Sequence, residues 1–559
     1  MGKFRRCLSV VSFSTLAIVL LRPALAPAAG GPPASAIAQR VHEPTHASFS
    51  PPGGSHQPGS IRSTIECVTH PSEAENVVLD CPNEYAFPNR ETSLAVDPED
   101  PRHLVEASMD RPFGDQAVEF ATSFDGGSTW TIGDIPHGED LQSFDPWVSF
   151  DVKHGLVLIS YQNLGANANY CPPPGGQFVV TSTDGGLHWN DPVEVFANQG
   201  CPEDPDSDFF GEGKVVTDDS PTSANFGRSW LMGNFETCVA GVCTFPAGES
   251  HSDDGGVTWS SPRSIVPDSP TDFCTVDHVP HACDNDFSPT HAAIAPDGSV
   301  TVVFDNEQHE AAWEPGECCE DQLLSVRTTD GGATWSGPVH VADMETGIDD
   351  SLGDYHCSLA INFTCALNGT DLLPIYLHSN MVFAPDGVLY VAFSDNRNGR
   401  HDRLHPVSND DVFLTWSLDG GQTWEGPAIV ADGPGDQYKP SLSVDPLTGE
   451  LGILFYDRGD DPHGTTMNVT LATGTPGDFD LKRVTTAPSH LTYDLWFTQT
   501  LPGCDRCVFH IGEYIGLAYG SDGAANMTWA DLRHLTTTPN GHSGYALNVD
   551  FARWEADRP

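Results

Sequence analysis

Short apolar segments with alternating character recur along most of the chain, and each runs through a turn rich in Asp and Gly into a second apolar segment. The alternation and the abundance of Val, Ile, Phe and Tyr predict β-strands. The second segment of a unit ends in Asp or Asn in most copies. No long segment with a period of 3.6 residues appears, so helices are not expected. We count seven units, whose first residues are Glu91, Asp145, Glu212, His291, Asn380, Lys439 and Glu513.

A second, shorter phrase follows each of the first five units. It has the form [Ser/Thr]-x-Asp-Gly-Gly-x-[Thr/His/Ser]-Trp, as in Ser123–Trp130. The Asp accepts hydrogen bonds from its own turn, and the two Gly supply the positive φ angles of a tight hairpin. The Trp buries a large ring at the start of the next strand. The five copies are centred on Asp125, Asp184, Asp254, Asp330 and Asp419.

The phrase resembles the Asp-box, or bacterial neuraminidase repeat. The chain is therefore similar to the sialidase-like β-propeller superfamily, over roughly residues 89–559. The copies lie 59 to 89 residues apart, which is too long for repeats of about 40–45 residues such as WD40. The sequence predicts an all-β propeller of four-stranded blades with long loops on one face. Seven units indicate seven blades, and six, the number in sialidases proper, is the alternative.

Propeller geometry places two sets of polar residues at the mouth of the central channel. One set consists of the first residues of the seven units. The other lies at the ends of the second strands, where carboxylates and arginines meet. Convergent polar groups from separate blades are typical of a small-molecule or sugar site. The alternative for each strand-end pair is a structural bond between blades. The second set comprises Asp110-Arg111, Asp395 with Arg397, Asp457-Arg458 and Asp531 with Arg533.

The resemblance also implies a catalytic mechanism. Sialidases use a Tyr nucleophile beside a Glu, an Asp acid/base and three Arg that hold the sugar carboxylate. Tyr514 and Glu513 occupy the position of the Tyr nucleophile late in the chain. Glu91, Asp145 and Glu212 are the further catalytic candidates. Substrate-binding candidates are Arg397, Arg458, Arg533, Arg111, Arg90, His291, Asp395, Asp457 and Asp531. The Arg-Ile-Pro motif of sialidases is absent, and Arg90 takes the nearest position.

Three functions remain open at this stage. The resemblance favours exo-α-sialidase-type hydrolysis of extracellular glycans. A glycosidase or lyase of other specificity would use two carboxylates drawn from Glu91, Asp145, Glu212 and Glu513. A non-catalytic glycan-binding or adhesion propeller would use the same face.

The N-terminus predicts export. Residues 1–29 have the basic start, apolar middle and small-residue end of a signal peptide, and no later segment is long enough to span a membrane. Residues 30–85 are rich in Pro, Gly and Ser and form a lead-in, and residues 86–559 form the propeller. Fourteen cysteines remain after the signal, several close in sequence such as Cys67 and Cys81, as expected for disulfides in a secreted protein.

The composition limits the kinds of partner that this protein is expected to bind. The formal net charge is −53 at pH 7, which argues against nucleic acid or an anionic membrane surface. We expect a carbohydrate ligand, no membrane insertion and a monomer. No cofactor is required and no metal site is predicted, although the many Asp residues in loops would suit Ca²⁺.

Overall fold

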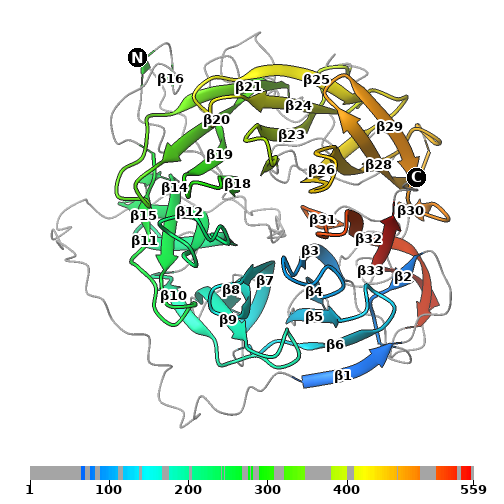
Figure 1. Cartoon of the computed structure of the whole chain (residues 1–559), viewed down its shortest axis with the longest axis horizontal. Helices are drawn as coiled ribbons and strands as arrows, with labels where there is room; N and C mark the ends of the chain where they lie inside the picture. Colours follow the sequence, from blue (N-terminus) through cyan, green and yellow to red (C-terminus); the bar gives the residue numbers. More distant parts are fainter. Residues whose placement is uncertain are drawn as a thin grey trace, which may run out of the picture.

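The protein forms a ring of seven antiparallel sheets around a central axis (Figure 1), as seen in a computed structural model. The fold prediction, an all-β propeller with seven blades, is confirmed. No helix occurs among the residues that the structure describes. These residues are 64–69, 76–81, 89–110, 117–137, 141–165, 175–200, 204–240, 242–244, 246–266, 275–276, 279–280, 289–306, 320–345, 379–399, 408–462, 464–491, 511–537 and 543–555.

Each blade is a meander of four strands that runs from the axis outward. Blade 1 contains β3 (Arg90–Val96), β4 (Leu104–Asp110), β5 (Ala117–Ser123) and β6 (Trp130–Asp134). Blade 2 contains β7 (Leu141–Asp151), β8 (Leu156–Gly165), β9 (Gly176–Ser182) and β10 (Val193–Ala197). Blade 3 contains β11 (Ser207–Thr217), β12 (Ser229–Val239), β14 (Ala247–Ser252) and β15 (Arg263–Ser264), with β13 (Val242–Thr244) paired to β12.

The other blades repeat this order. Blade 4 contains β18 (Pro289–Ile294), β19 (Val300–Asn306), β20 (Glu320–Thr328) and β21 (Val339–Glu345). Blade 5 contains β22 (Asn380–Phe383), β23 (Leu389–Asp395), β24 (Asp411–Ser417) and β25 (Glu425–Ala431). Blade 6 contains β26 (Gln437–Val444), β27 (Leu451–Asp457), β28 (Thr466–Thr475) and β29 (Asp478–Arg483), with β30 (Ser489–His490) paired to β28. A small hairpin, β16 (Thr275–Val276) and β17 (Val279–Pro280), lies outside the blades.

Blade 7 combines both ends of the chain. It contains β31 (Gly516–Tyr519), β32 (Ala524–Thr537), β33 (Ser543–Glu555) and, as its outer strand, β2 (Val77–Val78). The preceding strand, β1 (Thr64–Thr69), pairs with β6 of blade 1. The segment before residue 86 thus contributes two strands to the ring, where the sequence suggested only a lead-in. The short strands are hard to recognise in sequence, because their partners lie in distant parts of the chain.

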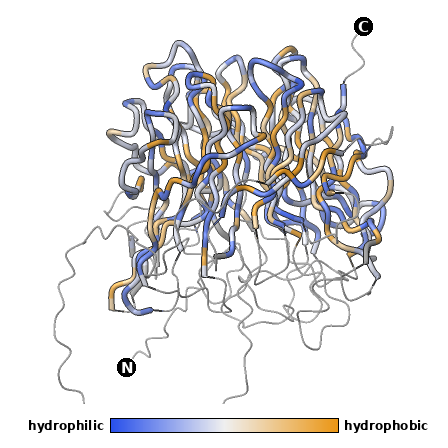
Figure 2. Tube along the Cα trace, turned by 90° about the horizontal axis from the view of Figure 1, so that it is seen from below, coloured by the Kyte–Doolittle hydropathy of each residue, from blue (hydrophilic) through white to orange (hydrophobic). Residues whose placement is uncertain are grey.

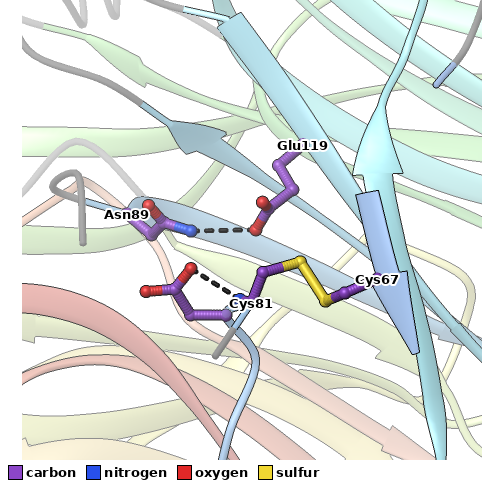
Figure 3. The surroundings of a disulfide bond; sticks show 5 residues. Cys67, Cys81, Asn89 and Glu119 are labelled. Atoms are coloured by element: carbon purple, nitrogen blue, oxygen red, sulfur yellow. Dashed lines mark hydrogen bonds between the residues drawn. A yellow bond between two sulfur atoms is a disulfide. The ribbon is translucent and has the colours of Figure 1, made fainter. Parts of the chain in front are cut away.

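A disulfide fastens this closing segment. Cys67 of β1 and Cys81 are bonded, as their spacing in the sequence suggested. Beside the bond, the Asn89 amide donates to the Glu119 carboxylate at 2.9 Å, and the Cys81 N–H donates to Asp80 at 2.7 Å (Figure 3). The bond therefore joins the strand added to blade 1 to the segment that completes blade 7.

Apolar clusters lie between neighbouring blades. For example, Val105 and Phe120 of blade 1 pack against Val157 and Tyr161 of blade 2. Figure 2 shows hydrophobic and hydrophilic residues interleaved along the strands, as expected for sheets that pack against neighbours. This burial holds the ring together, since each blade covers an apolar face of the next.

The Asp-box phrases form the hairpins between the third and fourth strands of blades 1–5. In the first, the Asp125 carboxylate accepts hydrogen bonds from the Thr129 N–H and hydroxyl, both at 2.8 Å. The Ser123 hydroxyl accepts from the Gly127 N–H at 2.9 Å. Equivalent bonds recur in the other four copies. These hairpins lie at the end of the blades opposite to where the first strands begin, and we call the latter side the open face.

Candidate functional site in the central channel

Five of the inner strands share an irregularity in their pairing. The pairing register of β3, β7, β11, β18 and β26 with the second strand of the blade shifts by a bulge. At four of these bulges a non-glycine residue has left-handed backbone geometry, with φ of 57° at Glu91, 54° at Asp145, 52° at Glu212 and 55° at Lys439. Such geometry costs on the order of 1–3 kcal/mol per residue and is concentrated at functional sites. All four residues belong to the ring that the sequence predicted.

The bulges direct charged side chains into the middle of the ring. Four carboxylates and three cationic groups meet there with one tyrosine, and all are buried. We call this group the central cluster. Its members are Glu91, Asp145, Glu212, Glu513, Arg90, Lys214, Lys439 and Tyr514.

The carboxyl groups of Glu91 and Asp145 lie close enough to affect each other's ionisation. Burial, followed by the charge of Glu513, raises the pKa of Glu91 from its ordinary 4.5 to about 8. Burial and the charge of Glu91 raise the pKa of Asp145 well above its usual range. Two carboxylates in contact and out of water cannot both ionise easily, so the pair retains a proton near neutral pH.

Glu513 faces the two ammonium groups of the central cluster. Lys439 and Lys214 both interact with its carboxylate. The Lys439 ammonium also donates to the carbonyl of Gly512, and the Lys214 ammonium lies 5.2 Å from the ring centre of Trp147. Burial lowers the pKa of each lysine to about 8. The cations therefore compensate Glu513, while Glu91 and Asp145 compensate each other by sharing a proton.

Gly512 allows blade 7 to come this close to blade 1. Its φ is +92°, and a Cβ at this position would lie 2.5 Å from the backbone nitrogen of Glu91. Only glycine combines this backbone geometry with this approach. The residue thus sets the position of Glu513 next to Glu91.

Tyr514 is part of the central cluster, but its hydroxyl is engaged elsewhere. It donates to the carbonyl of Pro146 at 3.0 Å. Burial, followed by the charge of Glu91, raises the pKa of Tyr514 well above 10. A phenolate is therefore costly at this position. Chemistry that starts from the Tyr514 phenolate would require a rearranged cluster.

Two half-buried aromatic side chains, Trp147 of β7 and His291 of β18, lie beside the central cluster. Asn380, the first residue of β22, is also half-buried. The Trp147 ring meets Tyr514 edge-on at 5.2 Å and His291 at 5.1 Å.

The strand-end arginines make structural contacts within their own blades, and two of them also bond the neighbouring blade: Arg397 donates to the carbonyl of Asp343 and Arg533 to Thr486. Arg458 is fully buried against Asp436 at 2.5 Å and donates to the carbonyl of Gly464. Arg397 pairs with Asp395 at 2.5 Å and covers the ring of Phe413.

Arg533 lies 3.3 Å from Asp531 and also binds Asp550. These contacts match the structural alternative given for such pairs, and the arginine clamp stays a prediction. Asp457 accepts from the Thr470 hydroxyl at 2.8 Å, and Arg111 lies outside the described residues.

The sequence predicted five members of the site that do lie together in the structure: Glu91, Asp145, Glu212, Glu513 and Tyr514. It did not predict Lys214 and Trp147. Both residues stand two positions after a ring residue, and the bulge turns that position toward the axis as well. The composition contained one indication that Lys214 belongs to the site. The chain has only five lysines, and two of them are in the central cluster.

The described residues show no grouping of three or more His, Cys, Asp or Glu side chains suited to a metal ion. They also contain no helix that is long and apolar enough to cross a membrane. The calcium ion suggested by the composition stays a prediction.

Comparisons with known proteins find only low similarity. No family model matches the chain, and no curated protein matches it. Among solved structures, a Hadza microbial sialidase aligns with 16% identity over 66% of this chain and 64% of its own, at a TM-score of 0.39. The chain thus spans 64% of the length of that sialidase.

Two further structures cover more of the chain. The NanB sialidase of Streptococcus pneumoniae aligns with 10% identity over 87% of this chain and 71% of its own, at a TM-score of 0.40. An ulvan lyase of polysaccharide lyase family PL25 aligns with 12% identity over 84% of this chain and 97% of its own, at a TM-score of 0.43. At these values the likeness supports no conclusion about this chain.

Proposed function

We propose that this protein is a glycoside-cleaving enzyme that acts on extracellular glycans at the open face of its central channel. The proposal rests on the buried, neighbouring carboxyl groups of Glu91 and Asp145, whose pKa values are raised, beside Glu513, which faces two lysines. Most glycosidases use one carboxyl group that is protonated and acts as the general acid, and a second that is ionised. The surroundings of the two groups set this difference.

Each group of the central cluster has a role in this proposal. Asp145, sharing its proton with Glu91, protonates the leaving oxygen of the glycosidic bond. Glu513, held between Lys439 and Lys214, stabilises the positive charge that develops on the sugar ring or attacks it. Trp147 and His291 contact the sugar on its way in. The disulfide between Cys67 and Cys81 supports an extracellular site of action.

Exo-α-sialidase-type hydrolysis is the first specific reaction to test. A sialic acid carries a carboxylate, and Arg90, Lys214 and Lys439 are the cations of the channel that could compensate it. The assay uses the purified full-length chain with a fluorogenic sialoside and with a panel of neutral aryl glycosides. Turnover of at least one substrate supports the proposal, and no turnover across the panel contradicts it.

The pH dependence should report the proton of the pair. Because burial and the charge of Glu91 raise the pKa of Asp145 well above its usual range, the general acid keeps its proton at neutral pH and loses it only in alkaline solution. We expect kcat to stay level through neutral pH and to fall on the alkaline side, measured from pH 4 to pH 10. A rate that rises through this range would contradict the assignment.

A tyrosine nucleophile and a carboxylate mechanism can be distinguished with one pair of variants. Tyr514→Phe removes a buried hydroxyl that donates to the carbonyl of Pro146, and Tyr161→Phe removes one that donates to the carbonyl of Pro136, both at 3.0 Å. If carboxylates carry the chemistry, both variants keep kcat within about tenfold of the wild type. A loss of about 10²-fold or more in Tyr514→Phe alone would assign the nucleophile to Tyr514.

A second candidate function is a non-catalytic glycan-binding propeller. The near-complete burial of the carboxylates favours it, because the same contacts would hold the inner strands together without any reaction. Binding on a glycan array by a protein without turnover would support this function.

A further inference from the structure

A cavity of about 380 Å³ opens at the rim of blade 7, away from the axis. It lies between β30 of blade 6, the end of β32 and the start of β33, and Asn76 just before β2 completes the wall. Figure 1 shows β30 at the outer edge of the ring, whereas β3, β7 and β31 surround the axis. Its size falls within the range of about 300–1,000 Å³ typical of small-molecule sites. The lining residues used here are Asn76, Thr486, His490, Arg533, His534 and Tyr545.

One wall of this rim cavity is aromatic. The rings of His490 and Tyr545 lie with their centres 4.8 Å apart and their planes inclined by 31°. Both side chains are half-buried, so part of each ring faces solvent. The face of an aromatic ring is electron-rich and attracts weakly positive C–H groups. The apolar face of a pyranose ring presents such a set of C–H groups.

The polar side of the rim cavity is held in place by the groups behind it. The Thr486 N–H and hydroxyl both donate to the Asn76 side-chain oxygen, at 2.8 and 3.0 Å. The Arg533 guanidinium donates to Thr486 at 3.1 Å and also binds Asp550. His534 contacts Asp550 through Nε2 at 2.7 Å, which leaves Nδ1 as its second hydrogen-bonding atom. Polar groups fixed in this way lose little freedom when a ligand binds.

The charges around the rim cavity do not favour an anion. Two cationic groups, Arg533 and His534, are matched by the buried carboxylates of Asp531 and Asp550. Asp80 lies close enough to interact with His534 as a third negative charge. Burial is the largest effect and acts to lower the pKa of His534, but the hydrogen bond to Asp550 and the charges of Asp550 and Asp531 together outweigh it, so the pKa is raised. A neutral ligand with many hydroxyls fits this arrangement better than a carboxylate or a sulfate.

We propose that the rim cavity is a second carbohydrate site, which binds a neutral pyranose residue of a glycan by stacking it on Tyr545 and His490. Hydroxyls of the sugar bond to Thr486, Asn76 and Nδ1 of His534. The cavity is on the same face as the ends of the second strands, so a glycan chain can lie across the open face. This inference goes beyond the proposed function, because it requires binding and no cleavage.

The test uses the full-length chain and three neutral disaccharides, lactose, maltose and cellobiose. Saturation-transfer difference NMR measures which sugar protons receive magnetisation from the protein. We expect transfer to at least one disaccharide, strongest at the C–H protons of one pyranose face. Tyr545→Phe keeps the ring and should keep the signal, whereas Tyr545→Ala should weaken binding at least tenfold in a titration. Circular dichroism melting curves show whether both variants are folded.

Two controls separate this site from the central channel. Asp145→Asn should leave the disaccharide signal unchanged, and Tyr545→Ala should leave cleavage of a fluorogenic monosaccharide substrate unchanged. Absence of transfer to all three disaccharides in the wild type would overturn the inference. An equal signal in folded Tyr545→Ala would overturn it as well. Neither result would bear on turnover in the channel.

Discussion

Replacing Asp145 with asparagine is expected to lower kcat by about 10²- to 10⁴-fold, the usual contribution of a general acid, while the propeller stays folded. Asn keeps the shape of the side chain and adopts left-handed backbone geometry more readily than most residues, so the φ of 54° at this position is retained. The amide cannot deliver a proton. The measurement is kcat on whichever aryl glycoside the wild type cleaves.

The same variant should be no less stable than the wild type at pH 8. Because the pKa of Glu91 is raised from 4.5 to about 8 in the folded state, the folded chain holds a proton that the unfolded chain releases between these values. Stability contributed by this group is therefore present below pH 4.5 and is lost as the pH rises through 8. Burial also raises the pKa of Asp145 well above its usual range, which adds a loss of the same sign, and asparagine removes that contribution. Thermal melting between pH 4 and pH 9 measures it.

Glu106→Gln is the matched control for Asp145→Asn. Glu106 is a buried carboxyl whose pKa burial raises to about 8, and it accepts a hydrogen bond from Thr92 at 2.7 Å outside the central cluster. We expect its kcat to stay within about threefold of the wild type, since distant substitutions usually change the chemistry little. If Asp145→Asn keeps a similar rate, Asp145 is not the acid.

Gly127→Ala is expected to destabilise the fold by about 3–5 kcal/mol, as the sum of backbone strain and overpacking. Gly127 belongs to the first Asp-box and has a φ of +88°. A Cβ there would lie 2.2 Å from the ring of Phe551 in β33. Since Phe551 also packs edge-on against Trp130 at 4.9 Å, the ring has little room to move. The substitution therefore acts on the contact between blades 1 and 7, where the propeller closes.

Gly387→Ala measures the backbone strain without the steric contact. Gly387 has the same φ of +88°, but a Cβ there would meet nothing within 4 Å. This variant should lose only the backbone strain of about 1–2 kcal/mol. Urea denaturation of both variants and the wild type gives the difference. Equal losses at the two positions would show that the contact with Phe551 does not restrict the closure of the ring.

The repeated elements could be predicted because their signals are local. In an Asp-box such as Ser123–Trp130, the side chain that shapes the turn and the turn itself lie within eight residues, so the phrase predicts its own hairpin. The same is true of the alternating inner strands. The closing strand β2 could not be predicted in this way, since Val77 and Val78 form a strand only through pairing with Phe551 and Asp550.

The sequence predicted that the first residues of the units converge, but it did not predict all the groups that surround them. Units of similar pattern placed Glu91, Asp145 and Glu513 at equivalent positions, and in a closed ring equivalent positions converge. The sequence did not reveal the bulges that bring Lys214 and Trp147 inward. It also did not show that Arg458 is buried against Asp436, because this contact depends on the path of two loops.

The sequence by itself determined the architecture: short alternating strands, hairpins encoded by Asp-Gly-Gly-x-x-Trp, and seven units that must bury their faces against one another. Only the tertiary structure decided the protonation of the site. Whether a carboxyl group keeps its proton depends on how much water and how many charges surround it. For Glu91 these surroundings come from blades 1, 2, 6 and 7, which meet only when the ring is closed.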